Sequence, residues 1–243
     1  MSIEKSKNLV HIKLKDKSGK NYLCSDFVNE LTQDIHSALE NPDLKVIIFS
    51  GLSDVFCGGA DRKTLEDLTQ GDLNPVDLTL PKVLLDIPVP IIAAMEGHAI
   101  GGGLAIGLCA DIMILAEESR YGCSFMNMGF TPGMGTTRLL EQFLSLGISH
   151  EILYTGINYK GRDLKGKTGF NYILPKKEVM PMAEQLAEAI VEKPRESLIT
   201  LKRYLGLNKR RLFEETFSIE NFMHEITFNK AETLNRVRKN YVG

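Results

Sequence analysis

The order of apolar and polar residues along the chain predicts a series of strands and helices. Leu9 to Lys15 alternates apolar with polar residues, as expected of a half-exposed strand. Asn21 to Glu40 carries apolar residues at helical spacing, with Ser25 or Asp26 as the expected N-cap. Three continuous apolar runs predict buried strands at Lys45 to Ser50, Ile91 to Met95 and Ile112 to Ala116.

The same pattern predicts further helices and a few short strands. Helices are predicted at Asp61 to Leu68, Leu78 to Leu85, Thr137 to Leu146, Arg162 to Thr168, Val179 to Glu192, Pro194 to Leu205 and Leu212 to Asn235. Short strands are predicted at Tyr121 to Asn127 and Tyr172 to Leu174, a strand or turn at Ile152 to Thr155, and a loop at Thr69 to Pro75. Because strands and helices alternate until about residue 175, we expect parallel crossovers and an α/β fold.

Two glycine turns are the first candidate for chemistry. The strand at Ile91 to Met95 leads to Gly101, Gly102 and Gly103, which open an apolar segment with helical character. A second turn, FCGGA, ends at Ala60 and again leads into a helix. A turn of this kind at a helix N-terminus leaves backbone N–H groups free for an anion, either a phosphate or an oxyanion that develops on a carbonyl.

The residues around the glycine triplet argue against a phosphate. The triplet matches neither the G-x-G-x-x-G pattern nor a P-loop, and no basic residue lies near it. The competing interpretation is that the amides of Ala60 and Gly102 form one oxyanion hole. On the residues alone, two tight turns that serve only packing explain the pattern equally well.

Composition limits the class of protein. The chain has 243 residues, 43% of them hydrophobic, and a net charge of −2, which gives no electrostatic case for binding nucleic acid. The charged, alternating N-terminus does not resemble a signal peptide, and no apolar run is long enough to span a membrane. The four cysteines are scattered without disulfide or metal spacing, so we expect a cytoplasmic protein.

Three motifs resemble the crotonase (enoyl-CoA hydratase/isomerase) superfamily, and the resemblance extends over essentially the whole chain. They are VFCGGAD (Val55 to Asp61), PVPIIAAMEGHAIGGGLAIGLCADI (Pro88 to Ile112) and GFTPGMGTTRLL (Gly129 to Leu140). The resemblance implies a repeated ββα spiral over residues 1–190 and a helical region over residues 191–243, for trimerisation and cover of the active site. It also implies that Ala60 and Gly102 are the oxyanion donors, with Gly101 beside the substrate.

Two apolar residues occupy the positions where hydratases of this superfamily carry glutamates. These residues are Ala105 and Phe125. Syn addition of water needs one acid and one base, so hydration is not expected here. Instead, we expect Ala105 and Phe125 to line the acyl pocket. Met126 and Met128 are candidates for the same lining, and a role as buried core filler explains them equally well.

Four further segments resemble one subfamily, the decarboxylases of β-branching cassettes in bacterial polyketide synthases. The segments are EGHAIGGG, FMNMGFTPGMG, KPRESLITLK and MHEITF. The resemblance implies decarboxylation of a 3-methylglutaconyl thioester on the phosphopantetheine of an acyl carrier protein, without a cofactor. The product would be a 3-methylcrotonyl type or its β,γ (exo-methylene) isomer. The alternatives are another crotonase activity, such as enoyl isomerisation of an acyl-CoA, and a non-catalytic protein that binds acyl carriers.

The resemblance also assigns side chains around the acyl group. His224, in MHEITF, matches the proton donor of these decarboxylases, whereas we expect His98 to be structural and to bond the loop backbone. The family places a lysine against the substrate carboxylate, and this chain departs from that pattern. Gln70, Leu68 or Asn74 occupies the expected position, so Lys63 is the candidate instead, with a solvated surface lysine as the alternative.

A basic segment near the C-terminus is a candidate docking surface for the acidic carrier protein. Its residues are Lys202, Arg203, Lys209, Arg210 and Arg211, and a solvated helix end explains them equally well. The predicted assembly is a homotrimer.

Overall fold

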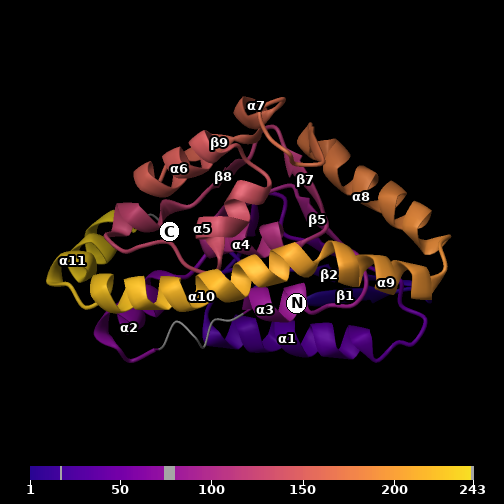
Figure 1. Cartoon of the computed structure of the whole chain (residues 1–243), viewed down its shortest axis with the longest axis horizontal. Helices are drawn as coiled ribbons and strands as arrows, with labels where there is room; N and C mark the ends of the chain where they lie inside the picture. Colours follow the sequence, from indigo (N-terminus) through magenta and orange to yellow (C-terminus); the bar gives the residue numbers. More distant parts are fainter. Residues whose placement is uncertain (17, 74–79, 242–243) are drawn as a thin grey trace.

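Two sheets form the centre of the molecule, which is described by a computed structural model covering residues 1–16, 18–73 and 80–241. The larger sheet has the order β1-β2-β3-β5-β7-β10 and the smaller one β4-β6-β8-β9 (Figure 1). The strands of the larger sheet are β1 (Ser2–Lys5), β2 (Leu9–Lys13), β3 (Val46–Ser50), β5 (Ile91–Met95), β7 (Ile112–Ala116) and β10 (Tyr172–Leu174). Those of the smaller sheet are β4 (Val55–Cys57), β6 (His98–Ile100), β8 (Arg120–Gly122) and β9 (Asn158–Lys160).

Three strands of the larger sheet are each followed by a short strand in the other sheet and then by a helical segment. The chain runs from β3 through β4 to α2 (Arg62–Gln70), from β5 through β6 to α4 (Gly102–Cys109), and from β7 through β8 to the 3₁₀ helix η2 (Ser124–Met128). The pairings β2–β3, β3–β5, β5–β7 and β7–β10 are parallel, as the alternation of strands and helices predicted. This repeat is the expected ββα spiral, so the predicted fold is confirmed.

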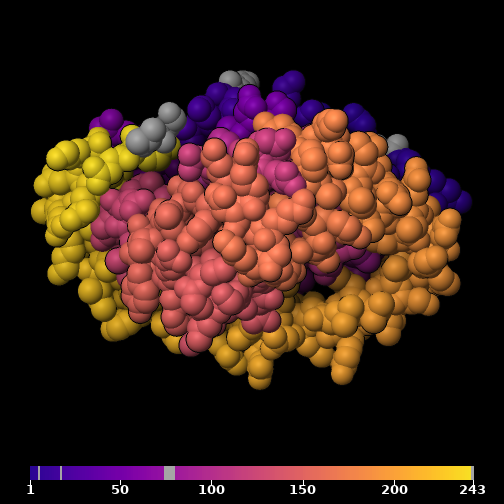
Figure 2. All heavy atoms as spheres, turned by 90° about the horizontal axis from the view of Figure 1, so that it is seen from above, coloured from indigo at the N-terminus to yellow at the C-terminus, as the bar shows by residue number. Residues whose placement is uncertain are grey.

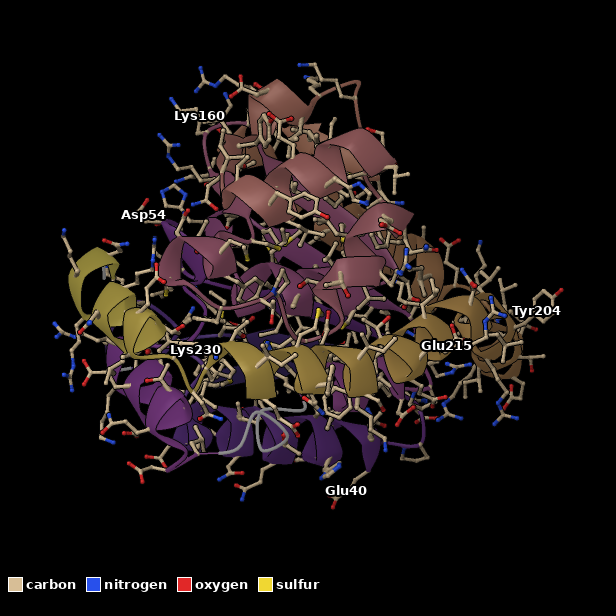
Figure 3. The ribbon with its side chains drawn as sticks, turned by 60° about the vertical axis from the view of Figure 1, so that its left-hand side comes forward. Glu40, Asp54, Lys160, Tyr204, Glu215 and Lys230 are labelled. Carbon is tan, nitrogen blue, oxygen red and sulfur yellow. The ribbon has the colours of Figure 1, made fainter. Side chains whose placement is uncertain are left out.

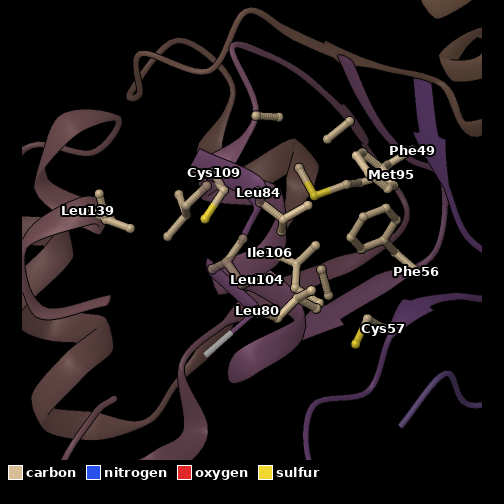
Figure 4. Packing of buried hydrophobic residues seen from close by; sticks show 14 of the residues in the cluster. Phe49, Phe56, Cys57, Leu80, Leu84, Met95, Leu104, Ile106, Cys109 and Leu139 are labelled. Carbon is tan, nitrogen blue, oxygen red and sulfur yellow. The ribbon is translucent and has the colours of Figure 1, made fainter. Parts of the chain in front are cut away.

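The core lies on both faces of the larger sheet, because a parallel sheet between helices is buried on each side. On one face, α8 (Lys176–Val191) places Val179, Ala183 and Ala187 against β3, β5 and β7. On the other face all eight residues of α4 are buried, and Figure 4 shows Leu104 and Ile106 of this helix among the core side chains around Phe56. The apolar sequence of α4 therefore reflects a helix surrounded by protein.

The C-terminal helices extend along one long side of the molecule and around one end (Figures 1 and 2). They are α9 (Arg195–Leu205), α10 (Leu207–Thr227) and α11 (Ala231–Asn240). Helix α10 packs against α3 (Leu80–Leu85) and α5 (Thr136–Leu139), and α11 packs against α2 and η2. Among the described residues after Val191 all regular structure is helical, and the division into domains at residue 190 stays a prediction.

Several predicted elements are wrong. Ile152 to Thr155 lies in helix α6 (Leu146–Thr155), and the predicted helix Thr137 to Leu146 is only α5 followed by the 3₁₀ helix η3 (Leu140–Gln142). The remaining helices are α1 (Ser25–Leu39) and α7 (Gly161–Leu164), and α1 begins after Cys24 with no side-chain cap from Ser25 or Asp26. Residues 74–79, part of the predicted loop and helix there, lie outside the described residues.

The predicted helix Leu212 to Asn235 is divided into α10 and α11. The hydroxyl of Thr233 donates to the carbonyl oxygens of Thr227 and Gly129, 2.7 and 3.1 Å away. These contacts hold the connection bent, so that α11 returns across α2. Sequence periodicity missed the break because both helices share the same spacing of apolar residues.

Candidate active site

A cavity of about 250 Å³ lies where the two glycine turns meet the C-terminal helices. Its wall comes from the ends of β4 and β6, from α2, α3 and η2, and from α10 and the residues after α11. Most of the wall is apolar: Leu23, Leu65, Leu68, Ile100, Phe125, Met128, Phe130, Met134, Phe213, Phe217 and Phe228. Among the described residues that line it, none is an aspartate or glutamate.

The two glycine turns lie against each other at the floor of the cavity. Gly59 and Gly101 have φ angles of +78° and +57°, a region that glycine adopts without the steric cost of a side chain. A Cβ atom on Gly59 would lie 2.8 Å from the Ile100 carbonyl oxygen and 3.5 Å from the Gly102 nitrogen. Each left-handed glycine precedes one candidate oxyanion donor, so the same backbone geometry positions the amides of Ala60 and Gly102.

Neighbouring hydrogen bonds hold both peptide units in place. The Leu23 amide donates to the Gly59 carbonyl at 2.9 Å, and the amides of Leu104 and Ala105 donate to the Gly101 carbonyl at 3.1 and 3.2 Å. These carbonyls belong to the same peptide units as the Ala60 and Gly102 N–H groups, and such chains of bonds polarise one another. Among the residues that the structure describes, neither amide has an acceptor of its own, so both remain available to a ligand.

His224 lies on α10, opposite the glycine turns, and is 7% exposed. Its Nε2 lies 3.0 Å from the Thr131 carbonyl oxygen, and because a carbonyl only accepts, this contact assigns the proton of the neutral ring to Nε2. Nδ1 is buried without a partner in the described part of the chain. Burial lowers the pKa of His224, and the nearby carbonyls of Thr131 and Pro132 oppose that shift.

Aromatic rings surround the imidazole. The ring centroids of His224 and Phe228 are 4.7 Å apart, and Phe130 lies 6.4 Å from His224 and 5.9 Å from Phe125. Gly133 contacts the other side of the imidazole, since a Cβ there would lie 2.5 Å from its Cε1 atom. The ring therefore has little freedom to turn.

Glu220, one turn before His224 on α10, joins this helix to the loop before α5. Its carboxylate accepts from the Gly135 amide at 2.6 Å, and from the amide and hydroxyl of Thr137 at 3.1 and 2.7 Å. Burial raises the pKa of Glu220, and these donors counteract the rise. Because donors of the loop occupy the carboxylate, Glu220 fixes the position of the helix that carries His224.

The structure brings together five of the eight predicted site residues. Ala60, Gly101, Gly102, Phe125 and His224 all line the cavity.

The other three predicted site residues do not line it. The Lys63 side chain is 82% exposed and pairs with Asp67 on the surface of α2. Ala105 is completely buried inside α4, where its methyl group packs in the core, and Met126 is 38% exposed on η2. None of the three lines the cavity, and their expected places in the site are corrected accordingly.

His98 has the structural contact that was expected of it. Its Nδ1 atom accepts a hydrogen bond from the Arg120 amide at 3.0 Å, so His98 bonds backbone as predicted, although this backbone belongs to strand β8 and not to the loop. His98 also lines the cavity, and Lys20, Arg120 and Lys176 lie close enough to lower its pKa, although burial is the larger cause.

The basic segment Lys202 to Arg211 does not form a free docking surface. Lys202 is 6% exposed and pairs with Asp111 at 2.5 Å, while the Lys209 ammonium donates to the carbonyls of Leu108 and Ala110. Arg210 likewise donates to the Leu85 carbonyl. These three cations hold the ends of α3 and α4 against α9 and α10, whereas Arg203 and Arg211 are exposed, so a docking role stays a prediction for those two alone.

Five polar residues of the cavity escaped the sequence analysis: Lys20, Tyr22, Ser124, Asn221 and Tyr241. Asn221 could have been found, because it precedes His224 by three residues and therefore lies on the same helix face. Tyr241 gave no local signal, since the contact of its hydroxyl with the Ala60 carbonyl, 3.2 Å away, spans 181 positions.

Comparison with known proteins identifies relatives of this chain. The profile of the enoyl-CoA hydratase/isomerase family matches residues 4–242. The chain is similar to the bacillaene synthase decarboxylase PksI of Bacillus subtilis, with 38% identity over 98% of this chain and 96% of the relative.

Two solved structures are similar to this chain over almost its whole length. A structure of a dehydratase/decarboxylase enzyme couple involved in polyketide β-branching superposes with a TM-score of 0.95 at 36% identity, covering 100% of this chain and 99% of the other. The ECH2 decarboxylase domain of CurF from Lyngbya majuscula gives a TM-score of 0.92 at 34% identity, over 99% and 98% of the two chains.

Proposed function

Because the chain belongs to the enoyl-CoA hydratase/isomerase family, we propose that it decarboxylates a 3-methylglutaconyl thioester on an acyl carrier protein during polyketide β-branching. The observation that carries this proposal is the combination of two free backbone amides with a cavity whose described lining contains no carboxylate. Hydration needs a carboxylate pair or an equivalent acid and base, whereas decarboxylation needs a site for the developing negative charge. The similarity to decarboxylases of 34–38% identity supports the same reaction.

The reaction begins with the thioester oxygen between the Ala60 and Gly102 amides. The bond to the carboxylate carbon breaks, CO₂ leaves, and the electron pair moves through the conjugated double bond onto the thioester oxygen. The resulting dienolate carries its charge where the two N–H groups point, and one such donor typically contributes about 3–4 kcal/mol to the transition state. No base is needed for this step.

The second step returns a proton to carbon, and His224 is the proposed donor. When the ring takes up a proton, that proton is on Nδ1, because Nε2 already donates to Thr131. Transfer to the γ carbon of the dienolate gives a 3-methylcrotonyl product, and transfer to the α carbon gives the β,γ isomer. Solvent then recharges the imidazole, so the reaction consumes one proton and releases one CO₂.

The proposed partner is the acyl carrier protein that holds the substrate on its phosphopantetheine, and the reaction uses no cofactor. Lys20 lines the cavity from an exposed position, and Arg120 and Lys176 lie near His98 beside it. Cations around the mouth of the cavity suit the phosphate of the carrier's prosthetic group and an acidic carrier surface. None of the described helices is long and apolar enough to cross a membrane, and the cytoplasmic location stays a prediction.

A homotrimer is proposed from the outer surface of α9 and α10. This surface exposes large apolar side chains: Leu201, Tyr204, Leu205, Leu207, Ile219, Phe222 and Ile226. Tyr204 is 73% exposed and projects from the ribbon at one end of the molecule in Figure 3. Exposed apolar side chains along two consecutive helices are typical of an interface between subunits.

The test is incubation of the purified protein with 3-methylglutaconyl-carrier protein, followed by the intact mass of the carrier. We expect the loss of one CO₂, and an unchanged acyl mass after long incubation would refute the proposal. If the mass is unchanged but NMR shows a shifted double bond, the protein is an enoyl isomerase. A double bond that also stays in place identifies a carrier-binding protein without catalysis.

A further inference from the structure

The wall that α10 presents to the cavity is aromatic except at one place. Phe213, Phe217 and Phe228 line the cavity, and between them lie two polar residues, Asn221 and His224. Residues three positions apart in a helix are neighbours on one face, so these two side chains stand together. They form one polar patch in an otherwise apolar wall.

The Asn221 side chain is free to bind a ligand. It is partly buried and lines the cavity, and it has no hydrogen-bond partner within residues 1–16, 18–73 and 80–241. The neighbouring residue Glu220 shows the contrast, because its carboxylate has three donors from the loop before α5. A primary amide that faces an apolar cavity and has no structural contact has two N–H donors available.

No cation reaches the interior of the cavity from the described residues. Lys20 is the one lysine or arginine among those that line it, and it is exposed, with its backbone carbonyl bonded to the Gly58 amide beside the oxyanion turn. Lys63 points outward, and the sequence of residues 74–79, NPVDLT, contains no basic residue. A carboxylate inside this cavity must therefore be met by neutral donors and by the imidazole.

We propose that the side-chain amide of Asn221 binds the carboxylate of the substrate that leaves as CO₂, and so selects acyl groups that carry one. This inference rests on the proposed function and adds the residue that recognises the leaving group. His224, its neighbour on the helix, faces the same carboxylate and then protonates the dienolate that remains when CO₂ has left. Asn221 touches the substrate but does not exchange a proton with it.

A neutral donor suits this reaction better than a cation. A bond to a charged partner stabilises the ground-state carboxylate strongly, yet that charge is gone when CO₂ forms. An amide orients the carboxylate so that the breaking bond is perpendicular to the conjugated plane. It also stabilises the carboxylate less than a cation would. The site therefore binds the transition state more tightly than the substrate. The hydrogen bonds from the oxyanion amides to the thioester oxygen strengthen while the bond to the carboxylate weakens.

The carboxylate also explains how a buried imidazole acquires its proton. Burial lowers the pKa of His224, which favours the neutral ring near pH 7. An anion bound by Asn221 one helical turn away reverses that shift, since an opposite charge favours the protonated ring. Proton uptake is then coupled to the arrival of a substrate that bears a carboxylate.

The test compares Asn221→Asp and Asn221→Leu, two substitutions of nearly the same size. Aspartate repels the substrate carboxylate and should lower kcat/KM for the 3-methylglutaconyl carrier by about 100-fold, mainly through KM. Leucine removes one hydrogen bond to a charged group and should lower it by about 10-fold. The affinity for the 3-methylcrotonyl carrier, which has no carboxylate, should stay within about twofold in both variants.

Asn208→Asp is the matched control, because it introduces the same charge on α10 at an exposed residue that bonds Gln142. A fall in product affinity that parallels the fall in kcat/KM would overturn the inference, as would full activity of Asn221→Asp. An inactive wild-type protein would instead refute the proposed function. The two failures are thus distinguishable, and thermal unfolding verifies that each variant is folded.

Discussion

The Tyr241 hydroxyl donates a hydrogen bond to the Ala60 carbonyl oxygen, 3.2 Å away, and so connects the end of the chain to an oxyanion turn. Tyr22 lies beside it, with the two ring centroids 6.3 Å apart, and burial, followed by the proximity of the Tyr22 phenol, raises the pKa of Tyr241. The phenol is therefore neutral at any working pH and remains a donor. Tyr241, which follows α11, therefore fixes the turn that carries the Ala60 amide.

Tyr241→Phe should remove this bond and leave the aromatic contact with Tyr22. We expect about 1 kcal/mol lower stability and a kcat reduced by roughly 5-fold, because the peptide that follows the Ala60 amide, and with it the turn, is held less firmly. Chemical denaturation and the intact-mass assay measure the two effects. A variant with unchanged kcat but lower stability would show that the bond supports only the fold.

Gly133→Ala should displace the His224 ring. The added Cβ would lie 2.5 Å from Cε1, while Nε2 must stay near the Thr131 carbonyl to keep its tautomer. We expect kcat to fall by roughly 10- to 100-fold, the usual range for a misplaced general acid. Gly147→Ala is the control, since a Cβ there meets nothing within 4 Å. Equal activity of the two variants would contradict the role of the ring position.

The stability of the folded protein should fall as the pH is lowered, in part because of His224. Its pKa is lowered on folding, so the unfolded chain binds more protons below the ordinary value of about 6.5, and acid favours unfolding. His11 and His98 have lowered pKa values for the same reason and contribute in the same window.

His224→Gln isolates the contribution of this one group. Between pH ~7.5 and ~5.5 the free energy of unfolding should decrease less in His224→Gln than in the wild type, as urea unfolding at both values would measure. An identical decrease in both proteins would show that His224 is not desolvated on folding. The same variant should lose decarboxylase activity if His224 is the proton donor.

Phe222→Glu should weaken the proposed trimer. Phe222 is 62% exposed on α10 and lies among the other apolar side chains of that surface. A charge buried at an interface without a partner costs several kcal/mol, so light scattering should report a smaller species. Gln33→Glu, at an exposed position of α1, serves as the control. A wild-type protein that is already a monomer would refute the trimer itself.

Local pattern was enough to locate most of the elements. The strands β5, β7 and β10 begin and end where the apolar runs predicted, because a buried strand in a parallel sheet is apolar along its whole length. The two glycine turns were also recognised from the sequence, because few residues other than glycine adopt a positive φ angle. His98 was assigned correctly from its place next to the triplet.

By itself, then, the sequence determined the positions of the buried strands, the glycine turns with their amides and the resemblance to a family. Only the tertiary structure decided which side chains face the cavity. Helical spacing says that residues share a face but not which neighbour that face meets, and so Lys63, Ala105 and Met126 were misplaced. The contacts of Tyr241 with Ala60 and of Lys209 with the end of α4 join residues about 100 or more positions apart, and no local pattern encodes them.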